Sequence, residues 1–349
     1  MKKLSWFNKV MYVLNGILIL LTFVAYVLPF LAPKAFPLLS VLTLILPSFL
    51  ILNGLFFIYW LLQFKRQLVL SGIVLLIGIT FINKFYKLSS TNLPKTEKDF
   101  TVMSYNVRLF NLFEWINDKN VGKDILAFVN EKNPDIICIQ EYSENAKIDL
   151  RVYKYKAIFI EGNKIKTGQA IFSKFPIFNQ GNLHLLQDGN NIIFADIKKG
   201  KDTLRVYNMH LQSIKISPDV NEISNNVETI NKEKSQMVFG RLRDAFKRQE
   251  FQTEIFSNHK KDCPYPMIIC GDMNNSAFSY IYRNIKGDLN DCFEEAGNGF
   301  GQTYNFKYYP ARIDYIFADK KMKVKWFKNF SSFNKSDHFP IMTRLSFAD

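Results

Sequence analysis

The hydrophobic pattern divides the chain into two parts. Three long apolar stretches, at residues 10–31, 38–64 and 68–82, follow one another, and none contains Asp or Glu. The first two exceed the ~20 residues that a helix needs to cross a bilayer, and the third can borrow flanking residues. The stretches lack the polar alternation of a water-soluble core helix, and they are too long and too numerous for one cleaved signal peptide. We therefore predict three transmembrane helices within a membrane anchor at residues 1–88.

After a polar linker at residues 89–99, the pattern changes to short apolar runs separated by Gly, Pro, Asn and Asp. Such runs are typical of strands. Nine are predicted: FTVMSYNV, DIICIQE, YKAIFI, GQAIFS, NNIIFADI, TLRVYNMHL, PMIICGDMN, RIDYIFA and HFPIMTRLSF.

Helical periodicity appears at residues 122–131 and 227–257, and a short third helix is predicted at 279–285. Gly200 supplies the turn of a hairpin between two of the strands. The pattern predicts one α/β domain at residues 100–349, with mixed, largely antiparallel sheets covered by helices.

The charge is unevenly distributed along the chain. The formal net charge is +14, and residues 1–89 hold eight Lys or Arg and no acid. Basic residues precede the first apolar stretch and lie between the second and third, which places both regions in the cytoplasm. In a bacterial inner membrane, three spans would then put residues 100–349 on the extracytoplasmic side. Lys84 and Lys87, directly after the third span, oppose this orientation. The milder excess in the rest of the chain suits an anionic substrate, a membrane surface or an ordinary mixed surface.

The four cysteines indicate little chemistry. Cys138 and Cys270 lie within apolar runs and are expected to be buried. A Cys263–Cys292 disulfide stays open as an alternative in an oxidising compartment. The spacing of Cys and His does not indicate a zinc site.

Polar side chains end several of the apolar runs, which suggests that the strands deliver them to one place. The residues concerned are Asn106, Glu141, Asn208, His210, Asp272 and Asn274. Asp314 lies inside an otherwise apolar strand, where a charge is costly unless it is paired. His338, which follows Asp337 before the last strand, is the expected partner of Asp314.

This set of residue types fits the cleavage of a phosphate ester. Glu141, with Asn106 nearby, could hold a hard cation such as Mg²⁺. Asp272 and Asn274 could orient and deprotonate a water molecule. Three further side chains could donate to the phosphoryl oxygens: Asn208, His210 and His338. Each of these residues alone has an ordinary structural explanation, and only their combination indicates a site.

The order of the motifs resembles the endonuclease/exonuclease/phosphatase superfamily, which includes deoxyribonucleases, abasic-site endonucleases, inositol-polyphosphate phosphatases and neutral sphingomyelinases. The motifs are SYNV, IQE, NMH, GDMN, RIDYIF and SDHFP, supported by GQAIFSKFPI and GQTY. The resemblance covers residues 100–349. It implies a four-layer α/β sandwich of two mixed sheets, dependence on Mg²⁺ or Mn²⁺, and hydrolysis by activated water.

Carried over by motif, the resemblance implies a role for each matching residue. Asn106, Glu141 and Asp337 bind or lie beside the metal. The implied catalytic residues are His210, Asp272, Asn274, Asp314 and His338, and the implied substrate contacts are Asn208, His210 and Asn274. Arg108 departs from the abasic-site nucleases, which tend to carry an acid there, and so weakens a role in DNA repair.

The leading hypothesis is a membrane-anchored, metal-dependent phosphoesterase. Its partners would be the lipid bilayer and a phosphate ester, which could be a lipid head group, a nucleic acid or a small molecule. A non-specific extracytoplasmic endonuclease is the alternative, followed by a non-catalytic binding protein on the same scaffold. A transporter is disfavoured because the apolar stretches hold no buried ionisable residue that would mark a pathway. The aromatic segment at residues 305–310 could contact substrate or membrane, or simply pack.

Overall fold

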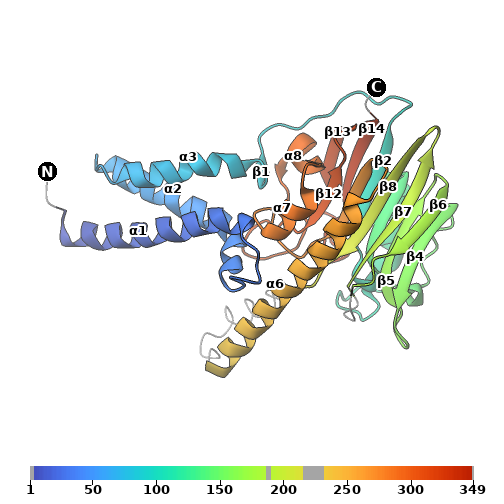
Figure 1. Cartoon of the computed structure of the whole chain (residues 1–349), viewed down its shortest axis with the longest axis horizontal. Helices are drawn as coiled ribbons and strands as arrows, with labels where there is room; N and C mark the ends of the chain where they lie inside the picture. Colours follow the sequence, from blue (N-terminus) through green and yellow to red (C-terminus); the bar gives the residue numbers. More distant parts are fainter. Residues whose placement is uncertain (1–3, 186–189, 215–231, 348–349) are drawn as a thin grey trace.

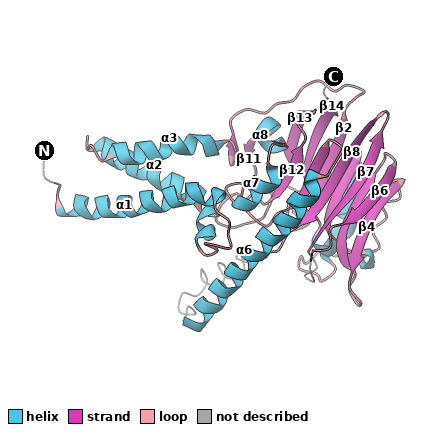
Figure 2. Cartoon of the chain, viewed as in Figure 1, coloured by secondary structure: helices cyan, strands magenta, loops and turns pink. Residues whose placement is uncertain are grey.

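The computed structural model describes residues 4–185, 190–214 and 232–347. Three apolar helices extend from one side of a domain built on two sheets (Figure 1). We call residues 6–87 the N-terminal module and residues 100–347 the two-sheet domain. Figure 2 separates the helices of the module from the strands of the sheets.

The first helix of the N-terminal module runs toward the sheets, the second runs away from them, and the third returns (Figure 1). Its helices are α1 (Trp6–Val27), α2 (Leu46–Leu62) and α3 (Leu68–Ile82), and the 3-10 helices η1 (Leu28–Phe30) and η2 (Leu39–Thr43) lie between α1 and α2. The start of α1 and the α2–α3 turn lie at the end farthest from the sheets (Figure 1). A short strand, β1 (Tyr86–Lys87), follows α3 and pairs with β11 (Gly299–Phe300).

The prediction of three transmembrane helices is wrong in number. Only the helical stretch Trp6–Phe30 is long and apolar enough to cross a membrane, among the residues described. The second predicted stretch divides into η2 and α2, and Pro47 lies in the first turn of α2. At about 1.5 Å per residue, α2 and α3 are roughly 25 and 22 Å long, which is less than the ~30 Å hydrocarbon core.

Two six-stranded sheets form the two-sheet domain. The first has the order β13-β14-β2-β3-β5-β4, and the second has the order β10-β12-β9-β8-β7-β6. The strands of the first sheet are β2 (Phe100–Asn106), β3 (Ile136–Tyr142), β4 (Tyr155–Glu161), β5 (Thr167–Ser173), β13 (Met322–Asn329) and β14 (Ile341–Phe347). Those of the second are β6 (Ile177–Asn182), β7 (Asn191–Lys199), β8 (Asp202–His210), β9 (Met267–Asp272), β10 (Asn290–Asp291) and β12 (Asp314–Ala318).

The sheets are mixed and mainly antiparallel, as predicted. Only β2–β3 and β8–β9 pair in parallel among the described strands. The core between the sheets is built from small and branched side chains that face inward, including Val102, Ile136, Ile193 and Val206. The β7–β8 hairpin turns at Gly200, whose φ of +61° suits glycine.

Helices cover the outer faces and complete the expected sandwich. Helix α4 (Val121–Lys132) packs against the first sheet, where Ile125 and Val129 contact the cluster that contains Ile137. Helices α6 (Lys232–Lys261) and α7 (Tyr280–Lys286) cover the second sheet. The remaining short helices of the described chain are η3 (Arg108–Asn111), η4 (Glu144–Ala146) and α8 (Cys292–Ala296).

All nine predicted strands are present, and the two long strands that were missed, β6 and β13, are edge strands. The edge position explains the miss, because such strands carry polar and charged side chains that weaken the apolar pattern. The predicted residues 227–231 of the long helix lie outside the described residues. All four cysteines are free, so the Cys263–Cys292 alternative is not realised.

Candidate active site

Neighbouring strands bring the predicted polar residues to one edge of the second sheet. In the ladder between β8 and β9, His210 lies opposite Asp272. In the ladder between β9 and β12, Asp314 also lies opposite Asp272. From the first sheet, β2 ends at Asn106, and Glu141 lies at an irregularity near the end of β3. The two sheets pack face to face, so their strand ends meet.

Unusual backbone conformations turn these residues toward one another. Glu141 and Asn274 have φ values of +51° and +48°, which side-chain-bearing residues rarely adopt. Gly271, at φ +141°, passes so close to Met209 that an added Cβ would lie 2.0 Å from the Met209 carbonyl oxygen. Strained backbone of this kind concentrates at functional sites.

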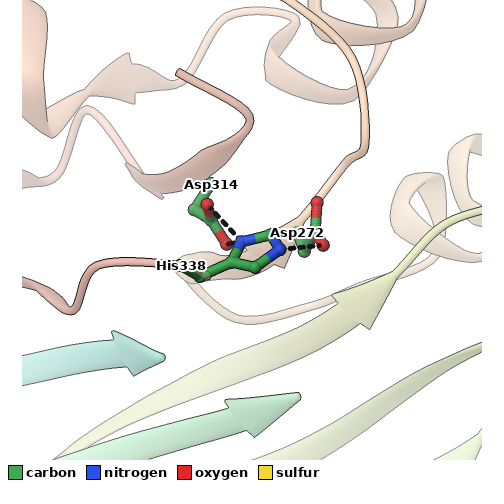
Figure 3. Close-up of side chains that lie close together, drawn as sticks. All are labelled: Asp272, Asp314 and His338. Atoms are coloured by element: carbon green, nitrogen blue, oxygen red, sulfur yellow. Dashed lines mark hydrogen bonds and ion pairs between the residues drawn. The ribbon is translucent and has the colours of Figure 1, made fainter. Parts of the chain in front are cut away.

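A buried histidine lies between two buried aspartates (Figure 3). The Nδ1 atom of His338 is 2.9 Å and 3.1 Å from the two Asp314 carboxylate oxygens, and its Nε2 atom is 3.6 Å from Asp272 Oδ2. Burial would lower the pKa of His338, but the nearby carboxylates of Asp314, Asp272 and Asp337 raise it well above its ordinary value. The predicted pairing of Asp314 with His338 is present in the structure.

Asp272 is a carboxylate under electrostatic strain. It is 1% exposed, and this burial is the main cause that raises its pKa to about 6. Asp314 adds to the rise, and His338 and His210 oppose it. The Asn274 backbone N–H donates to Asp272 Oδ1 at 2.7 Å, and the Asn274 side chain donates to the Leu211 carbonyl at 2.9 Å. Asp272 is therefore suited to exchange a proton near neutral pH.

Asn106 links the two sheets. Its Nδ2 donates to Glu141 Oε1 and to Asp272 Oδ2, both at 3.2 Å, and its Oδ1 accepts from the Arg108 backbone N–H at 3.1 Å. The predicted role as a metal ligand would require this amide to rotate. His210 Nε2 is 3.7 Å from both Glu141 Oε1 and Asp272 Oδ2.

Asp337 and Arg108 form the outer part of the site. Arg108 Nη1 is 3.3 Å from Asp337 Oδ2, and the guanidinium lies 4.6 Å from the ring centre of Trp115. The side chain of Ser336 donates to the Asn106 carbonyl at 2.9 Å and thereby holds the chain that carries Asp337 and His338.

These residues surround a single cavity of about 900 Å³. The predicted residues that line it are Glu141, His210, Asp272, Asn274, Asp337 and His338. Asn106 and Asp314 lie directly behind this wall, in contact with its carboxylates and imidazole.

Asn208 is the exception among the predicted residues. It is fully buried between the sheets, where its Nδ2 donates to the carbonyls of Ile139 and Ala170 at 2.9 and 3.0 Å. Its Oδ1 accepts from Gln140 Nε2 at 2.7 Å. These bonds join the two sheets, and they give no support to the predicted contact with substrate.

Two supporting residues were not among the predicted site residues. Thr303 Oγ1 accepts hydrogen bonds from the backbone N–H groups of Ile313 and Asp314, both at 3.0 Å, and so fixes the start of β12. Gln249 on α6 donates to the Gln212 carbonyl at 2.7 Å and to the Asn274 carbonyl at 3.3 Å. The GQTY motif contains Thr303 and was an available signal, whereas Gln249 lay unmarked on a polar helix face.

The donor chemistry fits a divalent cation. Glu141, Asp272 and Asp337 bring three carboxylates to one cavity wall, and such oxygen-rich sites suit Mg²⁺ or Mn²⁺. Asp272, Asp314 and His338 also lie close enough to share an ion. However, His338 Nδ1 already engages both Asp314 oxygens, so this trio is explained without one. The more exposed Glu141 and Asp337 are the better candidate ligands.

Comparisons with known proteins agree with this geometry. Residues 103–338, more than half of the chain, match the model of the endonuclease/exonuclease/phosphatase family, and residues 8–85 match a domain of unknown function, DUF8431. Comparison with curated proteins finds no significant match.

Solved structures share the fold at low identity. The human nocturnin catalytic domain, solved with a bound sulfate anion, is 20% identical with a TM-score of 0.53, covering 74% of this chain and 98% of its own. A mannosyl-6-phosphatase of Bacteroides thetaiotaomicron is 19% identical with a TM-score of 0.51, and the match covers 71% of this chain and 100% of that protein. TDP2 of D. rerio, complexed with a single-strand DNA product, is 16% identical with a TM-score of 0.51, and the match covers 72% of this chain and 100% of that protein. Taken with the family match, the chain belongs to the endonuclease/exonuclease/phosphatase family.

Proposed function

We propose that this protein is a divalent-metal-dependent phosphoesterase that hydrolyses a phosphodiester or phosphomonoester by direct attack of water. The observation that carries the proposal is the convergence of Glu141, His210, Asp272, Asp337 and His338 on one cavity. A non-catalytic binding protein would not need a buried aspartate with a raised pKa beside a buried, charged histidine.

The proposed metal ligands are Glu141 and Asp337, with Asn106 holding the Glu141 carboxylate in place. A bound Mg²⁺ or Mn²⁺ would neutralise charge on the phosphoryl oxygens. Glu141 is about one-third exposed at its side chain, and Asp337 is about one-quarter exposed, so both carboxylates are open to the cavity.

The proposed chemistry assigns the proton transfers to this chain's own residues. Asp272 accepts a proton from water while the water oxygen forms a new bond to phosphorus. Charged His338, held by Asp314, stabilises the additional negative charge on the phosphoryl group. The bond from phosphorus to the ester oxygen breaks, and His210 is placed to give a proton to the departing oxygen.

We also propose that the N-terminal module anchors the enzyme in a membrane. Its polar side chains face inward: Asn15 donates to Ser71 at 3.0 Å, and Asn53 donates to Thr22 at 3.0 Å. The outward positions are large and apolar, including Leu20, Ile51, Leu62 and Leu76, each more than 60% exposed. An apolar exterior around a polar, hydrogen-bonded interior suits lipid rather than water.

The basic residues give the anchor a proposed orientation. Lys65 and Arg66 lie at the α2–α3 turn, at the same end as the start of α1 and away from the sheets (Figure 1). The positive-inside rule places that end in the cytoplasm and the two-sheet domain on the other side. In this arrangement α1 spans the bilayer, and the shorter α2 and α3 pack beside it.

The test is a substrate panel assayed with the purified full chain. The panel includes bis-p-nitrophenyl phosphate, p-nitrophenyl phosphate, phospholipids and DNA, each with Mg²⁺, Mn²⁺ or EDTA. We expect metal-dependent hydrolysis that His338→Ala lowers by roughly 10²–10⁴-fold. A His259→Ala variant is the matched control, because His259 bonds to Tyr207 away from the cavity. Equal rates for the two variants, or turnover unaffected by EDTA, would contradict the proposal.

A further inference from the structure

One wall of the candidate active site is built by the N-terminal module. We call residues 28–45, which join α1 to α2, the connector. Val41, Leu44 and Ile45 of the connector line the same cavity as Asp272 and His338. Residues more than two hundred positions apart therefore share one pocket, whose lining combines acidic and apolar side chains.

The connector is fixed to the two-sheet domain by specific contacts. Tyr309 Oη donates to the Leu44 carbonyl at 3.1 Å, and Ser276 Oγ donates to the Thr43 carbonyl at 3.0 Å. The Lys34 backbone N–H donates to Glu250 at 2.6 Å. Val41 and Leu44 also pack against the apolar cluster formed by Ile214, Leu242 and Phe246. The wall is thus a built part of the pocket.

The aromatic segment, residues 305–310, contributes a second apolar part of the lining. Phe306, Tyr308 and Tyr309 face the cavity, and the Phe306 ring centre lies 5.3 and 5.0 Å from those of Tyr308 and Tyr309. A phosphate group gains no binding energy from apolar surfaces of this kind, whereas an apolar chain attached to the phosphate would be buried against them and would bind more tightly.

The apolar surface continues out of the pocket along α2. Ser48 lines the cavity, and Ile51, Leu52 and Leu55 follow it at helical spacings of three, four and seven residues. These three side chains are 62%, 45% and 59% exposed. One helix face therefore leads from the cavity toward the apolar exterior of the N-terminal module.

The charge of the pocket disfavours a nucleic acid. Among the described residues that line it, Arg108 is the only Lys or Arg, and it pairs with Asp337. A nucleic-acid strand presents a row of phosphates and is held by several cations. A pocket that combines carboxylates able to hold a metal with several apolar side chains fits a single phosphate with an apolar chain.

We infer that the substrate is a lipid phosphate ester, whose phosphate lies at Glu141, Asp272 and His338 and whose apolar chain lies against the connector and the aromatic segment. This inference rests on the proposed phosphoesterase function. It makes the N-terminal module part of the substrate site as well as an anchor.

The experiment compares short and long alkyl esters of one phosphate. The full chain in lipid nanodiscs is assayed with p-nitrophenyl methyl and p-nitrophenyl octyl phosphate, and with methyl and octyl phosphate by release of inorganic phosphate. Each buried methylene favours binding by about fourfold, so we expect kcat/KM for the octyl ester to exceed that for the methyl ester by roughly tenfold or more.

Leu44→Ser should lower this octyl-to-methyl ratio by about fivefold or more. Leu39→Ser is the matched control, since Leu39 lies in the same connector, is 44% exposed and does not line the cavity. Should Leu44→Ser fail to fold, Tyr308→Ser provides the same test from an exposed position. A ratio near one in the unmodified protein, or a ratio that neither Leu44→Ser nor Tyr308→Ser lowers relative to Leu39→Ser, would overturn the inference. Absence of metal-dependent hydrolysis of every ester would instead overturn the proposed function.

Discussion

Replacing Asp272 by asparagine should stabilise the fold while it abolishes turnover. Asp272 is buried and lies opposite Asp314 in the β9–β12 ladder, and the imidazoles of His338 and His210 lie 3.6 and 3.7 Å from its Oδ2 atom. The net effect of these surroundings is a pKa raised from 3.8 to about 6. An amide keeps the shape of the side chain and can still accept from the Asn274 N–H, but it carries no charge that burial disfavours.

The size and sign of the effect follow from the raised pKa. Each pKa unit corresponds to about 1.4 kcal/mol, so keeping Asp272 ionised in the fold costs about 3 kcal/mol. Well below pH 3.8 the carboxyl is protonated in both the folded and unfolded states, and this cost is absent. As pH rises from about 4 to 6, the unfolded state loses its proton first, and the wild-type protein loses stability that Asp272→Asn retains.

The assay is thermal unfolding of the metal-free full chain at pH 8 and at pH 4, in EDTA. A gain of about 3 kcal/mol corresponds to roughly 5–10 °C in Tm for a domain of this size. We expect Asp272→Asn to melt higher than wild type at pH 8 and close to wild type at pH 4. A Tm difference that is zero at pH 8, or equal at both pH values, would refute the electrostatic account of the site.

Three further predictions concern the metal, the backbone and the membrane. Glu141→Gln should raise the Mg²⁺ concentration for half-maximal activity by about tenfold or more, and an unchanged Mg²⁺ titration would exclude Glu141 as a ligand. Gly271→Ala should destabilise the two-sheet domain by more than about 3 kcal/mol, because its Cβ would meet the Met209 carbonyl oxygen at 2.0 Å. Denaturant unfolding checks this, with Gly240→Ala as a control where an added Cβ meets nothing within 4 Å. Protease added to spheroplasts should cleave the two-sheet domain; a protected domain would reverse the proposed orientation.

The sequence predicts the inner strands well because both of their faces are buried. The run Met267–Asp272 is buried at every position, and its continuous apolar character marks it as a central strand. β13 was missed because an edge strand exposes one side, so Lys323 and Lys328 interrupt its pattern. The polar residues that end the inner strands could be predicted for the same reason, because a charged side chain directly after a continuous apolar run departs clearly from the pattern.

The direction of a side chain and its tertiary partners were harder to predict. Asn208 and His210 lie two residues apart on the same face of β8, yet Asn208 is buried between the sheets and His210, at the end of the strand, lines the cavity. The connector was hidden in a long apolar stretch, where Val41 and Leu44 look like any other lipid-facing residue. Their place beside the candidate catalytic residues arises from docking between two parts of the chain, which no local pattern encodes.

The bond between Tyr309 and the Leu44 carbonyl has a practical consequence for the biochemist. A fragment trimmed to begin at Phe100 would be convenient to purify. It would, however, lack one side of the pocket, and it would expose Ile214 and Phe246 to solvent. Such a fragment would tend to self-associate. Its pocket entrance would be wider, and its substrate selectivity lower, than those of the full chain. Activity profiling is therefore best done with the helices in place.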